Sequence, residues 1–221
     1  MKNKNLEFKK YMHQDEFISF TKKIVNYLSS PEGLKKFLNA LFYAAVGIVV
    51  VIMLVTRSSN IDSQVQKSFA NAQSQYFGGE YDITIKNLEK LLKDYPKTKY
   101  TGEIMYYLGN CYYRTGKYDD AIKNYESAKK KYIQPILSPV VYSSLSYAYE
   151  EKKEYDKATA NYDEILKKFP DYYGNDRILF DMARCLRLSG KTEQAKEKYK
   201  EIVNKFPNSP LLPAVKENME R

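Results

Sequence analysis

A pattern that recurs every 37 residues constrains the fold more than any other feature of the sequence. It runs from about residue 65 to the end of the chain and places tyrosine, aspartate, alanine and proline at fixed positions. Its members are Tyr81, Tyr118 and Tyr155; Asp82, Asp119 and Asp156; Ala121, Ala158 and Ala195; Tyr125, Tyr162 and Tyr199; and Pro170 and Pro207. A period of this length indicates stacked supersecondary units. Each unit predicts two amphipathic helices joined by a tight turn, for example 103–114 and 118–131, so we expect an all-α fold.

These residues resemble the tetratricopeptide repeat (TPR) family. Leu108, Gly109 and Tyr112 match the first helix of that repeat, and Ala158 and Tyr162 match the second. The small residues let the two helices approach closely while the large ones fill the gaps. The resemblance implies a right-handed helix-turn-helix solenoid of about four repeats, followed by a capping helix at 210–221. The expected repeats are 65–98, 102–135, 139–172 and 176–209.

Two places depart from the family pattern. In the first unit Asn71 and Thr84 stand where leucine and alanine are expected, so this unit is expected to cap the array or to pack against another element. In the second unit the closing proline comes late, at Pro135. We therefore expect an irregular junction over residues 133–139.

A second strong feature is an uncharged stretch at residues 37–55, FLNALFYAAVGIVVVIMLV. As a helix it would extend about 28 Å, close to the ~30 Å hydrocarbon core of a bilayer. It is too long for the core of a cleaved signal peptide, and about 36 residues precede it. We therefore expect a transmembrane anchor at 34–56 and a linker at 57–64.

The charges beside this stretch predict its orientation. Lys22, Lys23, Lys35 and Lys36 precede it, whereas only Arg57 follows it closely. The positive-inside rule then places the N-terminus in the cytoplasm and the repeats in the periplasm of a bacterial inner-membrane, single-pass protein. Small residues on one face of the span predict a contact surface for a second membrane helix. These residues are Ala40, Ala44 and Gly47.

Residues 1–33 form a basic cytoplasmic tail in this interpretation. Apolar residues recur at helical spacing between Asp15 and Leu28, with lysines beside them, which predicts an amphipathic helix. Such a helix either lies on the membrane surface or docks against its own anchor or a partner. Ser30 followed by Pro31 and Glu32 is typical of the start of a new helix.

Charge and cysteine usage exclude several classes of function. The net charge of +9 divides almost evenly, with +5 in residues 1–60, and the lysines of the repeats alternate with acids. This pattern is typical of solvated helix faces rather than of nucleic-acid binding. Cys111 and Cys185 occupy equivalent small-residue positions two repeats apart. That separation exceeds the reach of a disulfide, so we expect two buried free thiols.

The sequence offers no candidate for catalysis. His13 is the one histidine, and it has no nucleophile or carboxylate cluster beside it. Metal-binding, dinucleotide-binding and phosphate-binding motifs are absent. We therefore expect a non-catalytic protein without cofactor, metal or small-molecule substrate.

The resemblance to TPR domains implies a concave groove lined by the first helix of each repeat. The aromatic residues and the arginines of the fourth unit suit an extended or helical peptide with acidic groups. The groove residues carried over from the family pattern are Phe69, Tyr76, Tyr106, Asn110, Tyr113, Arg114, Tyr147, Phe180, Arg184 and Arg187.

The whole architecture resembles the YfgM-type ancillary proteins of the bacterial Sec translocon. This resemblance implies a periplasmic scaffold for protein–protein interactions, with translocon subunits or periplasmic chaperones as partners. An alternative is a structural subunit of a larger envelope machine for secretion, motility or division, which would bind folded neighbours through convex or edge surfaces. A third possibility is a mitochondrial import-type receptor, which the basic flank disfavours.

Overall fold

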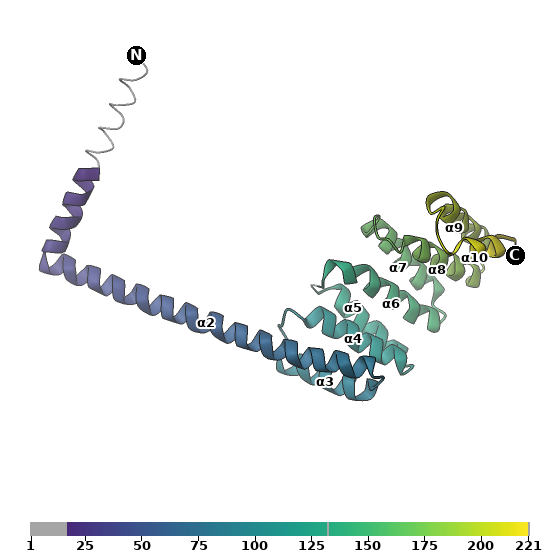
Figure 1. Cartoon of the computed structure of the whole chain (residues 1–221), viewed down its shortest axis with the longest axis horizontal. Helices are drawn as coiled ribbons and strands as arrows, with labels where there is room; N and C mark the ends of the chain where they lie inside the picture. Colours follow the sequence, from purple (N-terminus) through teal and green to yellow (C-terminus); the bar gives the residue numbers. More distant parts are fainter. Residues whose placement is uncertain (1–16, 132, 221) are drawn as a thin grey trace, which may run out of the picture. The chain divides into compact units, whose positions relative to one another are not determined.

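The computed structural model describes residues 17–131 and 133–220 (Figure 1). It divides into two compact units, Met1–Asn60 and Ile61–Arg221. Most of the described part of the chain is helical, and no strand occurs there. The all-α fold expected from the 37-residue period is confirmed.

The longest element is α2, Pro31–Phe77, with 47 residues. By length and composition it can cross a membrane, and its most apolar window is not buried against other described parts of the chain. Residues 57–64, which we expected to link anchor and repeats, are helical and belong to α2. The sequence of this segment, RSSNIDSQ, contains neither glycine nor proline, so nothing in it terminates the helix.

A sharp bend separates α2 from a helix at residues 17–29. The backbone N–H of Gly33 donates to the Ser30 Oγ at 3.1 Å, which is the N-cap that the sequence indicates. The described part of the expected amphipathic segment is helical, whereas Asp15 lies outside the described residues.

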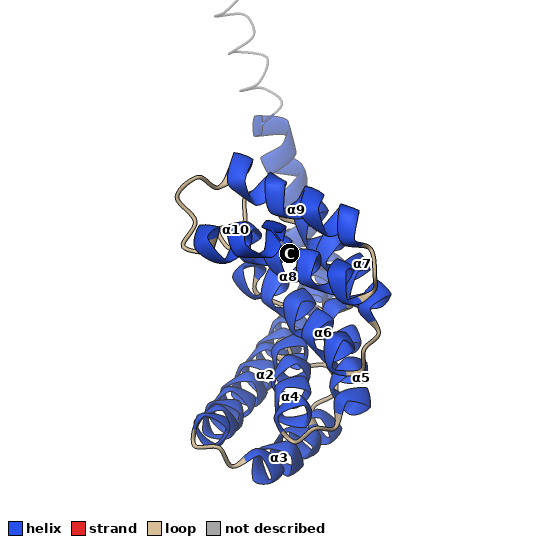
Figure 2. Ribbon diagram, turned by 90° about the vertical axis from the view of Figure 1, so that its right-hand side faces the viewer, coloured by secondary structure: helices blue, strands red, loops and turns tan. Residues whose placement is uncertain are grey.

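The second unit consists of antiparallel helix pairs stacked in sequence order (Figure 2). The end of α2 pairs with α3, and α4 with α5, α6 with α7, and α8 with α9 follow. The helices are α3 (Tyr81–Asp94), α4 (Thr101–Arg114), α5 (Tyr118–Lys129), α6 (Ser138–Glu151), α7 (Tyr155–Lys168), α8 (Asn175–Leu188), α9 (Thr192–Lys205) and α10 (Leu212–Glu220).

The turns inside the repeats share one backbone conformation at a position that also recurs every 37 residues. Gly79, Gly116 and Gly190 have φ values of 81°, 74° and 79°, and Lys153 occupies the same position with φ 60°. In the second repeat the N–H after the turn glycine, that of Lys117, donates to the Tyr112 carbonyl at 2.8 Å. This is the Schellman ending, which needs a left-handed residue and favours glycine.

The core follows the repeat. Tyr125, Tyr162 and Tyr199 are each at most 1% exposed, which makes them the largest fully buried side chains of the described residues. A Cβ on Gly109 would lie only 2.5 Å from the Tyr125 ring, so the glycine permits the close approach of α4 and α5. The C-terminal helix α10 closes the array by burying Val215 in the same cluster as Ile202 of α9.

The junction between the second and third repeats is irregular, as expected. Helix α5 ends at Lys129, and a 3-10 turn, η1 (Pro135–Leu137), precedes α6. Lys129 reaches across this junction: its Nζ donates to the Asn161 Oδ1 at 2.9 Å and lies 4.3 Å from the centre of the Tyr142 ring.

Candidate protein-binding groove

The first helices of successive repeats line a cavity of about 270 Å³ within the second unit. Six of the expected groove residues lie on its wall, and Tyr125 and Ser144 complete it. These six are Tyr76, Tyr106, Asn110, Tyr113, Arg114 and Tyr147. The repeat explains why they meet, because Tyr76 and Tyr113, and likewise Asn110 and Tyr147, are 37 residues apart and occupy equivalent positions on stacked helices.

Aromatic contacts and hydrogen bonds hold the walls of this cavity. Tyr76 packs edge-on against Tyr107 with ring centres 5.3 Å apart, and Tyr106 packs against Tyr107 at 5.5 Å. The buried Tyr125 hydroxyl donates to the Asn110 Oδ1 at 2.7 Å. Arg114 is exposed, and a hydrogen bond with Tyr76 raises the pKa of its guanidinium. The cavity thus presents several phenol rings and a cation.

A second cavity, of about 350 Å³, adjoins the first. Tyr113 and Tyr147 line both, and Glu150, Glu151 and Arg184 complete the second. The two cavities therefore form a continuous groove along α4, α6 and α8, which we call the tyrosine groove. Its residues are those of the two cavities together.

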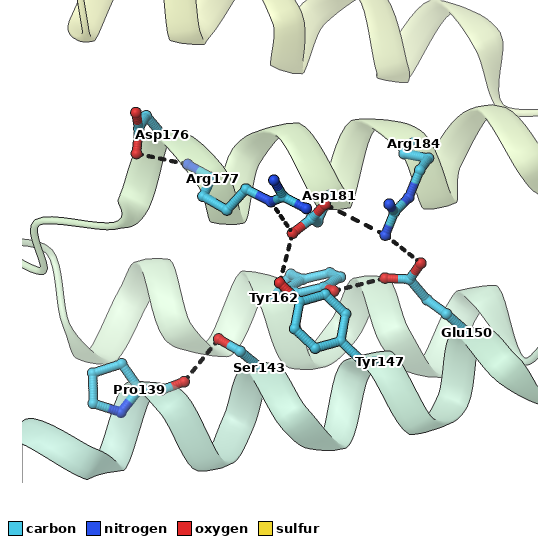
Figure 3. A network of polar contacts seen from close by, with 9 residues as sticks. All are labelled: Pro139, Ser143, Tyr147, Glu150, Tyr162, Asp176, Arg177, Asp181 and Arg184. Carbon is cyan, nitrogen blue, oxygen red and sulfur yellow. Dashed lines mark hydrogen bonds and ion pairs between the residues drawn. The ribbon is translucent and has the colours of Figure 1, made fainter. Parts of the chain in front are cut away.

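A polar network lies at the fourth-repeat end of the tyrosine groove (Figure 3). Asp181 is fully buried, and its Oδ2 accepts hydrogen bonds from the Tyr147 hydroxyl at 2.8 Å and from the Arg177 Nε at 2.9 Å. Glu150 accepts from the Tyr162 hydroxyl at 2.6 Å and from the Arg184 Nη2 at 2.5 Å. Burial is the main cause that raises the pKa of Tyr147 and Tyr162, and the neighbouring carboxylates raise it further.

This network changes the electrostatic argument made from the sequence. Arg184 lines the groove, but Glu150 at 2.5 Å and Asp181 at 3.3 Å already neutralise it. Arg187 is not among the residues that line either cavity. The fourth repeat therefore does not present a pair of free arginines to an acidic partner. Sequence reasoning missed Asp181, although its spacing of four residues from Arg177 and three from Arg184 is typical of ion pairs on a helix.

Two other expected groove residues belong to the core instead. Phe69 is 6% exposed and packs against Tyr100 and Tyr107. Phe180 packs edge-on against Tyr199 with ring centres 5.6 Å apart. The second repeat covers the ring of Phe69, whereas the ring of Phe180 packs against the second helix of its own repeat, α9.

The expected membrane-helix contact lies within α2. Ala40 and Ala44 are exposed, and a Cβ on Gly47 would meet no atom within 4 Å. A partner helix at this face stays a prediction.

The described residues contain no group of three metal-ligating side chains. His13 lies outside the described residues. Both cysteines are free and buried, as expected, and burial raises the pKa of the Cys111 thiol to about 12. A thiol that is buried and protonated is a poor nucleophile.

Family models place the chain among known proteins. Three models described as tetratricopeptide repeat match residues 72–98, 102–134 and 149–218. Together with the fold, they show that the chain is a tetratricopeptide repeat protein, and TPR domains generally bind other proteins. No curated protein sequence matches the chain significantly.

Solved structures agree on the fold. A tetratricopeptide repeat protein from Parabacteroides merdae ATCC 43184 is similar with a TM-score of 0.61 and 17% identity, over 71% of this chain and 59% of that one. MamA from AMB-1 is similar with a TM-score of 0.55 and 20% identity, over 68% of this chain and 78% of that one. MamA from MSR-1 is similar with a TM-score of 0.54 and 19% identity, over 72% of this chain and 84% of that one. At these identities the likeness concerns the fold alone.

Proposed function

We propose that this protein is a membrane-anchored scaffold that holds a segment of a partner protein in the tyrosine groove. The observation that carries the proposal is the wall of phenol rings, joined by Arg114, which no described part of the chain fills. Tyrosine and arginine are enriched at protein interfaces because they bury much apolar area and still offer polar contacts. A groove whose wall extends over several repeats suits a polypeptide segment rather than a small substrate.

The tyrosine rings favour a partner segment that contributes both apolar side chains and backbone groups. Rings that pack against one another, as Tyr76, Tyr106 and Tyr107 do, lose little conformational freedom when a ligand arrives. Arg114 adds attraction for a carboxylate at one end, and Glu151 adds attraction for a basic group at the other. The partner segment is therefore of mixed charge rather than uniformly acidic.

The proposed place of action is the periplasmic face of a bacterial inner membrane. The apolar stretch in α2 supports the anchor, and the lysines before it support a cytoplasmic N-terminus. In that location translocon subunits and periplasmic chaperones are the partners we propose. A reporter enzyme that is active only outside the cytoplasm, fused to the C-terminus, tests the orientation, and an inactive but intact fusion would reject it.

A second candidate is a structural role in a larger envelope complex. It is favoured by an apolar cavity of about 420 Å³ at the loop edge of the array, away from the tyrosine groove residues. Ile136, with 70% of its surface exposed, and Tyr173, with 83% exposed, lie on its wall. Such an edge would contact a folded neighbour rather than a peptide.

Affinity purification of the full chain from its own membranes tests the proposal. Arg114→Glu reverses the charge of an exposed groove residue and is expected to reduce recovery of the partner at least several-fold. The matched control is Lys123→Glu, because Lys123 is also exposed and lines neither cavity. Equal recovery with both variants would count against the groove, and loss only with Tyr173→Ala would favour the edge.

A further inference from the structure

The helix at residues 17–29 carries large apolar side chains that no other described part of its unit covers. Phe17, Phe20 and Val25 are each at least 60% exposed, and Ile24 and Tyr27 are 40% and 49% exposed. Of the two possibilities open at the sequence level, docking against its own anchor is therefore not what the structure shows. The helix requires another apolar environment.

The distribution of residues around this helix indicates which environment that is. At about 100° per residue, the apolar side chains cover roughly half of the circumference. The other half carries Ser19, Asn26 and Ser29, and Lys22 and Lys23 stand at its two borders. Lysines at both borders of the apolar face can extend their ammonium groups to lipid phosphates while their stems stay among acyl chains.

The charged residues around the bend are mostly basic. Residues 17–36 contain four lysines and a single acid, Glu32, which pairs with Lys36 at 2.8 Å. The side chains of Lys22 and Lys23, and that of Lys35 at the start of α2, are exposed. A protein partner for this surface would need a matching acidic face, whereas an anionic lipid surface supplies both the apolar depth and the negative charge.

The bend itself is built into the sequence. The Ser30 Oγ donates to the Tyr27 carbonyl at 2.8 Å and accepts from the Gly33 N–H, so one side chain closes the first helix and begins the second. A Cβ on Gly33 would lie 2.0 Å from the Tyr27 carbonyl oxygen, and only glycine permits this approach. The apolar stretch begins at Phe37, about two helical turns after the bend.

We propose that residues 17–29 lie in the membrane interface and bind anionic lipid headgroups through Lys22, Lys23 and Lys35. This inference rests on the proposed membrane anchor, because the bend brings the helix to the surface that α2 enters. The apolar face of the helix inserts beside the acyl chains, and the lysines contact headgroup phosphates.

The chain contains no tryptophan, so a single introduced tryptophan reports its own surroundings. The full chain with Phe20→Trp is reconstituted into vesicles of phosphatidylcholine, with or without phosphatidylglycerol. We expect blue-shifted emission and strong quenching by brominated lipid in the anionic vesicles. Asn26→Trp, on the polar half of the same helix, is the matched control and is expected to stay water-like and weakly quenched.

The lysines are tested in the Phe20→Trp background. Lys22→Gln with Lys23→Gln is expected to lower the ratio of membrane-inserted to free helix about 25-fold in anionic vesicles, since each lysine contributes about fivefold to surface binding. The same pair of changes is expected to have little effect in phosphatidylcholine alone. Equal insertion in both lipids, before any change of the lysines, would overturn headgroup binding.

Failure of the inference and failure of the anchor are distinguishable. A full chain that does not float with vesicles contradicts the anchor itself. A chain that floats but shows water-like emission from position 20 overturns this inference alone. Blue-shifted emission that lipid quenchers do not reach would assign the face to a protein partner or a second copy, and would overturn it as well.

Discussion

The Glu150 Oε2 lies 2.5 Å from the Arg184 Nη2, and this ion pair joins the first helices of the third and fourth repeats. Both side chains line the second cavity of the tyrosine groove. The pair therefore determines the shape of the groove and at the same time removes two charges from its binding surface. Exchanging Arg184 for glutamate would place an acid against Glu150 and Asp181, so a loss of binding in that variant would not report the groove.

Glu150→Gln tests how much this ion pair contributes to the free energy of unfolding. A glutamine cannot accept from both the Tyr162 hydroxyl and Arg184 with the same strength, because it has lost the charge and one acceptor oxygen. We expect a loss of about 2 kcal/mol in the free energy of unfolding, measured by urea denaturation in detergent.

Glu151→Gln is the matched control, because Glu151 is exposed and its hydrogen bond from Tyr113 is long, at 3.2 Å. Its expected effect is below about 0.5 kcal/mol. Similar losses in the free energy of unfolding for the two changes would contradict a stabilising role of the Glu150–Arg184 ion pair.

Lys129 is predicted to hold the irregular junction between the second and third repeats. Its ammonium contacts Asn161, Glu164 at 3.2 Å and the face of Tyr142. Lys129→Ala is expected to cost about 1.5–3 kcal/mol in the free energy of unfolding. The neighbouring exposed Lys130 serves as the control, and a cost for Lys130→Ala as large as that for Lys129→Ala would refute this role.

Lys153→Gly is predicted to stabilise the protein. The residue has φ 60°, whereas the three equivalent turns have glycine. A left-handed conformation costs a residue with a Cβ about 1–2 kcal/mol, and the added freedom of glycine in the unfolded chain offsets part of the gain. We expect a net gain of about 0.5–1 kcal/mol and a comparable loss for the reciprocal change Gly116→Ala. Destabilisation by Lys153→Gly would mean that the lysine side chain makes a contribution that outweighs the strain.

The buried cysteines predict a loss of stability in alkali. Burial raises the pKa of Cys111 to about 12, so the folded state retains a proton that the unfolded state loses above pH ~8.5. The stabilisation is fully present below that pH and declines up to pH about 12, by at most ~1.4 kcal/mol per pH unit for one thiol. Unfolding midpoints across this range measure it, and Cys111→Ala is expected to flatten the decline.

The same burial predicts slow reaction with thiol reagents. At pH 8 neither Cys111 nor Cys185 is expected to react with a disulfide reagent until denaturant is added, because each thiol is both covered and protonated. Rapid labelling of the native protein would contradict the packing of α4 or α8.

The sequence predicted the repeats well because their spacing is a packing constraint. Tyr125, Tyr162 and Tyr199 are buried where the 37-residue period places them. The same logic brought six groove residues onto one cavity wall. The period could not show which side chains pair internally: Arg184 looks available for a ligand in the sequence, and only the fold brings Glu150, 34 residues earlier, against it.

The sequence did not predict that α2 continues through residues 57–64, and the reason is a different one. Residues 57–64 are polar and follow an apolar stretch, so a change of composition suggested a linker, whereas helix termination needs a breaking residue that this segment lacks. Phe69 shows a third limit, since a family position that faces the groove in an average repeat is covered here by Tyr100 and Tyr107.

Photocrosslinking in the living cell tests the central claim most directly. A photoreactive phenylalanine analogue replaces Tyr113, which lines both cavities of the tyrosine groove, or Tyr173, which lies at the loop edge. We predict a discrete protein adduct from position 113 that disappears in the Arg114→Glu background, and none from position 173. Adducts from position 173 alone would contradict the groove and assign binding to the edge of the repeats.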